Sequence, residues 1–340
     1  MTVPPTIPPK NRDIYNATIK MFGSQPEPAF ETRERQLTDW GRQWGCDNDV
    51  GQIRMVLMHR PGDEFNIVDP TKRIEEIGSY GDLQAGWYWQ SEHIPELTEM
   101  QDQHDALADV LRAEGAEVVY LDEIKDNQFK SVYTRDSSFA IKGGAIVSRM
   151  APRMRQGEEQ TVSRTLANLG MPILRTITDT GMIEGGSFAW LNSDTAVVGR
   201  GIRVNDEAIE QLAEVLNRQG VDLMIVDLPA YSIHIDGWML MIDKDLCLID
   251  PRGLSQTFID DLSYMGIRTI EINPDDNSWV INGLAVSPGR VIMPEGLSDG
   301  TAKELDAHHI EIITVPYDKV QLNGGGIHCS TCPLIRDSVE

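Results

Sequence analysis

Residues 187–199 (SFAWLNSDTAVVG) carry the pattern that decides the fold. Two apolar runs flank the turn-forming segment Asn-Ser-Asp, so this stretch predicts a β-hairpin. Residues 205–219 (NDEAIEQLAEVLNRQ) follow, with apolar side chains at helical spacing and Asn205 as a candidate N-cap. Residues 223–226 (LMIV) then form a short apolar run typical of a buried strand. One unit of the fold is therefore predicted as strand, strand, helix, strand.

The same unit recurs along the chain. We expect further hairpins at residues 138–150, 237–249 and 283–293, an early one at 53–59, and a second clear helix at 101–114. Return strands are expected at 117–121, 173–177, 223–226, 268–272 and 311–315, and their starts lie 43 to 56 residues apart. A period of this length is typical of repeated units packed around an axis or in a row. The sequence therefore predicts five units rather than two unrelated domains.

Composition limits the classes of partner. The chain has 340 residues, with 30 Lys and Arg against 53 Asp and Glu, which gives a formal net charge of −23. Nucleic acids and anionic membranes both require a basic surface, so we expect neither as a partner. Hydrophobic residues make up 41% of the chain, which is ordinary for a globular protein.

Targeting and redox signals point to a cytoplasmic protein. No apolar run approaches the roughly 18 residues of a membrane helix. The start of the chain (MTVPPTIPPKNRD) is proline-rich and lacks the apolar segment of a secretory signal. Four cysteines (Cys46, Cys247, Cys329 and Cys332) are too few and too irregularly spaced for a disulfide scaffold. We expect residues 1–50 to form an arm with a short helix, and residues 51–340 to form a single catalytic domain.

Four polar clusters interrupt the repeat, each beside a predicted strand. They are Tyr-Thr-Arg-Asp ending at Asp136, Glu-Gly-Gly-Ser starting at Glu184, His234-Ile-Asp236, and the segment from Gly324 to Cys332 (GGGIHCSTC). If the units surround an axis, equivalent edges of successive units face one another. One Asp, one Glu, one His–Asp pair and one Cys would then converge.

This set of side chains suits covalent chemistry on a cation. A His beside a Cys favours the nucleophilic thiolate, and a Glu that accepts from the imidazole orients it. A simple Cys–His enzyme does not require two further carboxylates such as those of Asp136 and Asp236. A guanidinium would satisfy both carboxylates through bidentate hydrogen bonds.

Other interpretations of these residues stay open. A buried Cys is commonly a small apolar residue, which suits Cys247, and His234 could be a hydrogen-bonded core imidazole. Cys329 and Cys332 form a C-x-x-C pair, which is also compatible with zinc binding or dithiol redox chemistry. A zinc site would need His328 and a distant further ligand. We expect neither a metal nor another cofactor.

The ordered set TRD, EGG, HID-G and GGGIHCSTCPL resembles the guanidino-group-modifying enzymes, which comprise the arginine deiminases, dimethylarginine dimethylaminohydrolases and amidinotransferases. The resemblance runs from about residue 51 to the C-terminus and includes the helix and strand at QDQHDALADVLRAEGAEVV. It implies a five-bladed α/β-propeller (pentein) with pseudo-fivefold symmetry. It also implies that Cys329 is the nucleophile, His234 the general acid and base, and Glu184 the residue that orients His234. Asp136 and Asp236 would hold the guanidinium.

The resemblance extends to two arginines. Arg155 follows Asp136 by 19 residues and Arg203 follows Glu184 by 19 residues, as do the carboxylate-binding arginines of arginine deiminases. The alternative is that both are ordinary surface arginines.

The chain also departs from the family pattern in three places. Ser187 replaces the usual Asp of E-G-G-D, Lys130 replaces an Asn, and Gly324 replaces an Arg. The last two changes alter contacts to the amino-acid end of an arginine-like substrate. Residues 82–92 (DLQAGWYWQSE), with Trp87 and Trp89, are expected to form either a lid or a packing loop.

The resemblance implies a hydrolase of linear amidines that cleaves a guanidinium C–N bond through a covalent amidino-thioether on Cys329. The alternative is an amidinotransferase that passes the amidino group to an amine, using the same residues. A further alternative, from another class, is a non-catalytic ligand-binding propeller, which retention of the whole residue set disfavours. The expected partner is a small cationic guanidino substrate, and a homo-oligomer is left open.

Overall fold

The protein is described by a computed structural model that covers residues 27–82 and 84–339. The expected proline-rich arm falls mainly on residues 1–26, which lie outside the described residues. A short polar helix, α2 (Arg33–Trp40), precedes the repeat, and Gly41 ends it in the left-handed conformation at φ 73°. The division of the chain into an arm and one catalytic domain stays a prediction.

The four later hairpins are confirmed. Each predicted hairpin folds into two antiparallel strands: β6 (Ser138–Ile141) with β7 (Gly144–Val147), β9 (Phe188–Asn192) with β10 (Thr195–Arg200), β12 (Met239–Asp243) with β13 (Leu246–Ile249), and β15 (Leu284–Ser287) with β16 (Arg290–Pro294). Turn residues between apolar runs allow this pairing because the two strands are close in sequence.

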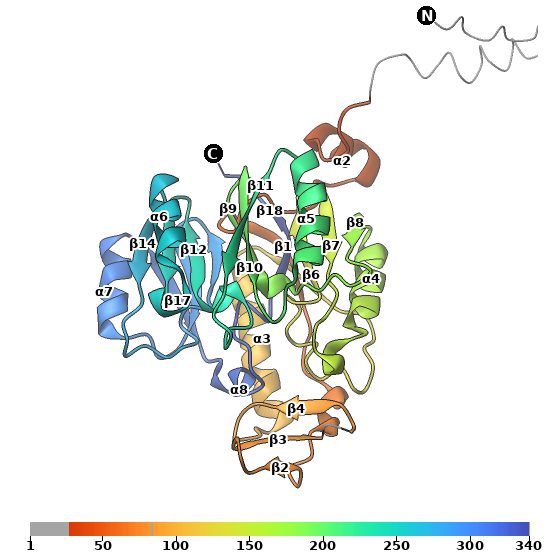
Figure 1. Cartoon of the computed structure of the whole chain (residues 1–340), viewed down its shortest axis with the longest axis vertical. Helices are drawn as coiled ribbons and strands as arrows, with labels where there is room; N and C mark the ends of the chain where they lie inside the picture. The colour runs from red at the N-terminus through yellow and green to blue at the C-terminus, as the bar shows by residue number, and fades with distance from the viewer. Residues whose placement is uncertain (1–26, 83, 340) are drawn as a thin grey trace, which may run out of the picture.

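A helix leads from each hairpin to a third strand that runs parallel to the hairpin's second strand. The third strands are β8 (Ile173–Thr176), β11 (Asp222–Asp227), β14 (Arg268–Glu271) and β17 (Glu311–Val315). The helices are α4 (Glu158–Leu169), α5 (Asp206–Arg218), α6 (Gln256–Tyr264) and α7 (Asp299–Ala307). Figure 1 shows these helices on the outside of the sheets. The result is a mixed α/β fold of repeated three-stranded sheets.

The first unit differs from the prediction. Strand β1 (Ile53–Met58) does not form a local hairpin, because a Pro-Gly segment and a short 3-10 helix (Asp63–Ile67) follow it. Its antiparallel partner is instead β18 (Cys332–Arg336) at the far end of the chain, and its parallel partner is β5 (Glu117–Tyr120) after α3 (Leu97–Ala113). All residues of β1 except one are buried, so a strand is needed on each side.

Neighbouring units touch through their first strands. β18 lies against β6, and β12 lies against β15. Phe139 of β6 stacks on Phe188 of β9 at 4.6 Å between ring centroids. The Arg336 guanidinium of β18 donates to the carbonyl of Ala285 in β15 at 2.9 Å. The segments that precede these first strands are therefore brought toward one another.

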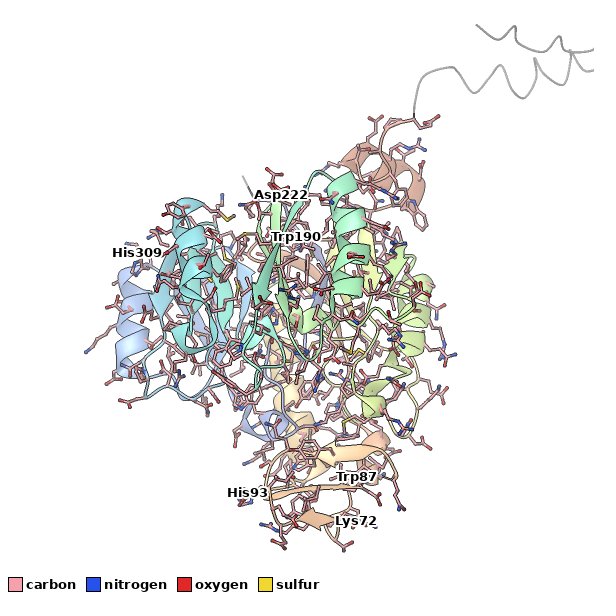
Figure 2. The ribbon with its side chains drawn as sticks, viewed as in Figure 1. Lys72, Trp87, His93, Trp190, Asp222 and His309 are labelled. Atoms are coloured by element: carbon pink, nitrogen blue, oxygen red, sulfur yellow. The ribbon has the colours of Figure 1, made fainter. Side chains whose placement is uncertain are left out.

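A small sheet of β2 (Arg73–Ile74), β3 (Ser79–Asp82) and β4 (Trp87–Trp89) projects from one end of the molecule, near the short helix α8 (Asp318–Gln321) (Figure 1). Figure 2 places Trp87 and His93 on this projection, at the opposite end from Asp222. Trp89 is fully buried, packs edge-on against Phe65 and donates to the carbonyl of His93 at 2.8 Å. None of the described helices is long and apolar enough to cross a membrane.

Asn205 caps α5 and also ties it to the preceding loop. Its side-chain oxygen accepts from the amides of Ala208 and Met182 at 3.2 and 2.9 Å, and its amide donates to the carbonyl of Thr180 at 2.8 Å. We predict that Asn205→Ala lowers the free energy of unfolding by about 1–2 kcal/mol, the usual range for a lost cap. Urea unfolding checks this value, with Asn217→Ala on the exposed face of the same helix as a control. Equal stability of the two variants would contradict the capping role.

Candidate active site

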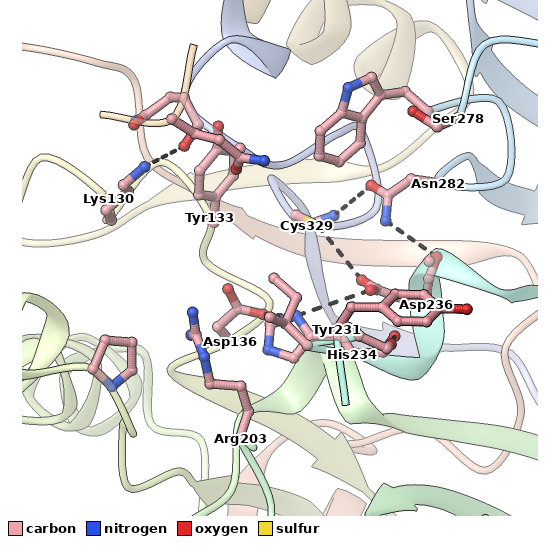
Figure 3. A pocket seen from close by; sticks show the side chains of 18 of the residues that line it. Lys130, Tyr133, Asp136, Arg203, Tyr231, His234, Asp236, Ser278, Asn282 and Cys329 are labelled. Atoms are coloured by element: carbon pink, nitrogen blue, oxygen red, sulfur yellow. Dashed lines mark hydrogen bonds and ion pairs between the residues drawn. The ribbon is translucent and has the colours of Figure 1, made fainter. Parts of the chain in front are cut away.

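Five polar side chains occupy equivalent places in the five units, just before the first strand of each. They are Asp136, Glu184, Asp236, Asn282 and Cys329. A cavity of about 740 Å³ lies at this end of the strands. It is lined by every predicted site residue except Glu184, which is fully buried behind His234. The sequence-predicted residues are thus brought to one place (Figure 3).

Glu184 holds the imidazole of His234. Its Oε2 lies 2.7 Å from His234 Nε2, and its Oε1 accepts from the amide of Ala151 at 3.0 Å. The other ring nitrogen, Nδ1, faces Asp136 Oδ1 at 3.6 Å and Asp236 Oδ1 at 4.0 Å. Burial alone would lower the pKa of His234, but the carboxylates of Asp136 and Glu184 outweigh burial and raise it. His234 is therefore set up to carry a proton next to the cavity.

The two expected arginines line the cavity, and both are paired with acids. Arg155 is buried and donates to Asp136, to both oxygens of Glu158 at 2.9 and 2.8 Å, and to the carbonyl of Tyr133 at 3.0 Å. Arg203 donates to Glu184 Oε2 at 2.8 Å. Burial would raise the pKa of Glu184, but the hydrogen bond from His234 and the charge of Arg203 lower it to about 2.

Asp236 connects Cys329 to a second histidine. One of its oxygens, Oδ2, accepts from His328 Nδ1 at 2.9 Å and from the Cys329 thiol at 3.5 Å. Burial raises the pKa of Cys329 well above its usual range, and the nearby charges of Asp236 and Asp136 raise it further. This environment favours the thiol of Cys329 over the thiolate. A cation placed between the two carboxylates would oppose that effect.

The glycines of the polar clusters allow these side chains to approach the backbone. A Cβ on Gly186 would lie 2.6 Å from His234 Nδ1 and 2.8 Å from Asp136 Oδ1. A Cβ on Gly325 would lie 2.6 Å from the ring of Tyr133, and one on Gly326 would lie 2.5 Å from Asn282 Oδ1. Side chains at these positions would displace site residues, which explains the Gly-Gly runs physically.

The sequence interpretation missed Asn282 and gave His328 no part in the predicted site. Asn282 Oδ1 accepts from the Cys329 amide at 3.3 Å, and its amide donates to the Asp236 carbonyl at 3.2 Å. The sequence did contain a signal for Asn282, because it precedes the hairpin of β15 and β16 just as Asp136 precedes the hairpin of β6 and β7. Ser187, the departure from E-G-G-D, is fully buried and does not line the cavity.

The donor atoms of the site give little support to zinc binding or to dithiol redox chemistry. Cys332 donates to the Ser138 carbonyl and is not among the residues that line the cavity, and both Cys329 and Cys332 are free thiols. Asp136, Glu184 and His234 do lie close enough to share a metal ion. Both of those carboxylates are already paired with arginines, whose charge would repel a divalent cation.

The expected aromatic loop is anchored to the body and also reaches the site. Trp89 packs into the core, as a packing loop predicts, whereas Tyr88 and Gln90 line the cavity. Trp238 and Trp279 form part of the cavity wall contributed by other units. The cavity wall thus combines the polar residues of the site with aromatic side chains from several units.

A family model described as "N,N dimethylarginine dimethylhydrolase, eukaryotic" matches residues 84–336, well over half of the chain. An arginine deiminase of Rhodococcus erythropolis is 21% identical over 86% of this chain and 97% of its own length. An N(G),N(G)-dimethylarginine dimethylaminohydrolase of Pseudomonas aeruginosa is 25% identical over 70% of this chain and 91% of its own length.

Two solved structures have the same fold. A cysteine-to-serine mutant of the Pseudomonas aeruginosa dimethylarginine dimethylaminohydrolase, complexed with citrulline, superimposes with a TM-score of 0.67 at 18% identity and covers 84% of this chain and all of that one. An inosamine-phosphate amidinotransferase of Streptomyces griseus gives a TM-score of 0.69 at 16% identity and covers 88% of this chain and 98% of that one.

The raised pKa of His234 depends on Glu184. We predict that Glu184→Gln lowers the His234 pKa, because it removes a buried negative charge while an amide oxygen can still accept the hydrogen bond. Nitrogen-15 NMR titration of the imidazole measures the change. Glu210→Gln, on the exposed face of α5, makes the same change in net charge and should leave the His234 pKa unaltered. Identical titrations in all three proteins would contradict the assignment.

The thiol of Cys329 gives a second electrostatic test. We predict that Asp236→Asn lowers the Cys329 pKa, since a negative charge next to the sulfur is lost. The pH dependence of alkylation by iodoacetamide, followed at Cys329 by mass spectrometry, reports this pKa. The control is Asp222→Asn, an exposed residue of β11 at the end of the molecule away from the projecting sheet (Figure 2). A shift of equal size in the control would remove the local explanation.

Proposed function

The chain belongs to the family described as N,N dimethylarginine dimethylhydrolase, and from this premise we propose that it is a cysteine-dependent hydrolase of a guanidino compound. The observation that carries the proposal is the position of the Cys329 thiol, 3.5 Å from Asp236, in a cavity that also holds Asp136 and the imidazole of His234. A planar cation between the two aspartates would place its central carbon close to the sulfur.

We propose that the substrate itself promotes formation of the nucleophile. In the free enzyme, burial and the two aspartates favour the protonated thiol of Cys329. A guanidinium bound to Asp136 and Asp236 brings a positive charge that offsets theirs. The thiolate therefore forms when a guanidinium that it can attack is bound next to it.

The reaction follows from these charges. As the cation binds, the Cys329 thiol releases its proton to solvent water, and the resulting thiolate adds to the guanidinium carbon to give a tetrahedral adduct. The imidazolium of His234 donates its proton to the departing nitrogen, the C–N bond breaks, and an amidino-thioether remains on Cys329. Water adds next, with His234 accepting its proton, and collapse of the second adduct releases a ureido product and the thiolate. Glu184 stabilises the imidazolium by its hydrogen bond to Nε2.

An amidinotransferase remains the second candidate, because the same covalent intermediate could be attacked by an amine instead of water. It is favoured by the resemblance to the Streptomyces griseus amidinotransferase structure and by a cavity of about 740 Å³, which has room beyond a guanidinium. A lid that excludes water would favour transfer, and Tyr88 and Gln90 are the residues of the projecting segment that border the cavity.

We propose positioning roles for the two arginines. Arg155 fixes the orientation of Asp136, since its donors are directed to Asp136, Glu158 and main-chain carbonyls. Arg203 helps to keep Glu184 ionised. The spacing of both arginines suggested direct contact with a substrate carboxylate, but each guanidinium is already paired with an acid, so we propose the positioning roles instead.

We also propose that residues 51–340 form one five-bladed propeller with pseudo-fivefold symmetry. Five sheets of the same strand pattern support this arrangement, as do the contacts between their first strands. β18, the last strand, completes the sheet of β1 and β5, so the first blade is built from both the early and the late part of the described chain. The site lies where one end of all five first strands would meet.

The decisive experiment compares two cysteines three residues apart in one segment, Cys329 and Cys332. We predict that Cys329→Ser abolishes turnover of every guanidino compound tested, while Cys332→Ser retains it, because Cys332 lies outside the cavity. A panel of guanidino compounds is assayed for ammonia or amine release and for a ureido product, with and without an added acceptor amine. Mass spectrometry of the wild-type protein should trap an amidino adduct on Cys329. Activity in Cys329→Ser would overturn the proposal, and turnover only with an acceptor amine would select the transferase.

A further inference from the structure

One cation that lines the cavity differs from the others in having no acidic partner. Arg155 is paired with Asp136 and Glu158, Arg203 with Glu184, and Arg252 with both oxygens of Asp250. Lys130 also lines the cavity, but forms no ion pair with any described residue. Its ammonium donates to the Asn323 carbonyl and lies near the rings of Phe129 and Trp89, at 5.2 and 5.8 Å from their centroids.

The environment of Lys130 is costly for an unpaired charge. The residue is 8% exposed, and burial together with the charges of Arg155 and Arg203 lowers its pKa well below the usual range. A buried ammonium is stable when it faces an anion, and an isolated one is not. This wall of the cavity is therefore complementary to a negatively charged group.

The acidic side chains of the cavity have no capacity for a second cation. Among the described lining residues the carboxylates are Asp136, Asp236 and Asp250. The first two face the place proposed for the guanidinium, and Asp250 is held by Arg252 at 2.8 and 2.6 Å. A ligand with an ammonium group in addition to its guanidinium would meet Lys130 and the arginines without an acid to pair with.

We propose that the substrate is a guanidino carboxylic acid without an α-ammonium group, and that its carboxylate pairs with Lys130. Figure 3 shows Lys130 on the side of the cavity away from Asp236, with Tyr133 between Lys130 and Cys329 in this view. The two charged ends of such a molecule would thus contact opposite walls. This inference rests on the proposed function and adds to it a chemical class of substrate and a specificity-determining residue.

Three matched compounds test the proposal. 4-Guanidinobutyrate carries the carboxylate, butylguanidine lacks it, and arginine carries both the carboxylate and an ammonium. The wild-type kcat/KM should be about tenfold or more higher for 4-guanidinobutyrate than for butylguanidine, as expected for one charge-assisted pair. It should also be higher than for arginine. A wild-type preference for butylguanidine or for arginine would overturn the proposal.

Two variants locate the effect. Lys130→Met should raise KM for 4-guanidinobutyrate by about tenfold or more, while kcat/KM for butylguanidine changes little. Lys130→Arg, which keeps the charge, should restore part of the preference. Lys125→Met, on the exposed part of the same loop, is the control and should behave as the wild type. An equal loss for both compounds in Lys130→Met would show a structural role instead.

Calorimetry separates failure of this inference from failure of the proposed function. If the wild type turns over no guanidino compound, the hydrolase and transferase are both rejected. Binding of 4-guanidinobutyrate and of butylguanidine to Cys329→Ser then still tests Lys130. Tighter binding of the acid, lost on adding Lys130→Met, supports the inference, and equal binding of the two compounds contradicts it.

Discussion

Burial of carboxylates at one end of the first strands is the constraint on which the rest of the site depends. Asp136, Glu184 and Asp236 are each at most 6% exposed, and each must be matched by a cation or a hydrogen-bond donor. Arg155, Arg203 and the two histidines supply most of that compensation. The negative charge that these groups do not compensate lies beside Cys329. There it favours the protonated thiol and is complementary to a guanidinium. Fold stability and the proposed recognition of a guanidinium therefore depend on the same charge distribution.

The pairing of β1 with β18 brings the Cys329 segment to this cluster of charged side chains. β18 carries the Cys329 segment at its start, and it can reach the site only because β1 pairs with it across nearly the whole sequence. The Arg336 guanidinium in β18 is buried and donates to the carbonyls of Gly51 and Ala285, so the closing strand is tied to the first and last units. A loss of packing at this junction would displace Cys329, whose segment leads directly into β18.

The sequence predicted what depends on local pattern. The hairpins, the third strands and the helix at residues 205–219 follow from apolar periodicity, turn residues and a cap, and the structure confirms them. The pairing of β1 could not be predicted in this way, because its partner is distant in sequence and β1 resembles the first half of a hairpin. The convergence of Asp136, His234 and Cys329 was predictable from their order relative to the strands. Asn282 escaped because an Asn before a hairpin is also an ordinary turn residue.

Spacing alone also could not say what each cation of the site contacts. Arg155 and Arg203 stand at the same distance after an acidic residue, and yet one is enclosed by carboxylates and carbonyls while the other borders the cavity. In the sequence, Lys130 is distinguished only as a departure from a family pattern. Its importance comes from the pairing of its neighbours: because each arginine in the cavity already has an acid, the lysine is the cation at which an anionic group of a ligand would change the energy most. Such a conclusion requires the whole set of contacts, since the electrostatic role of one residue is decided by what the others leave unpaired.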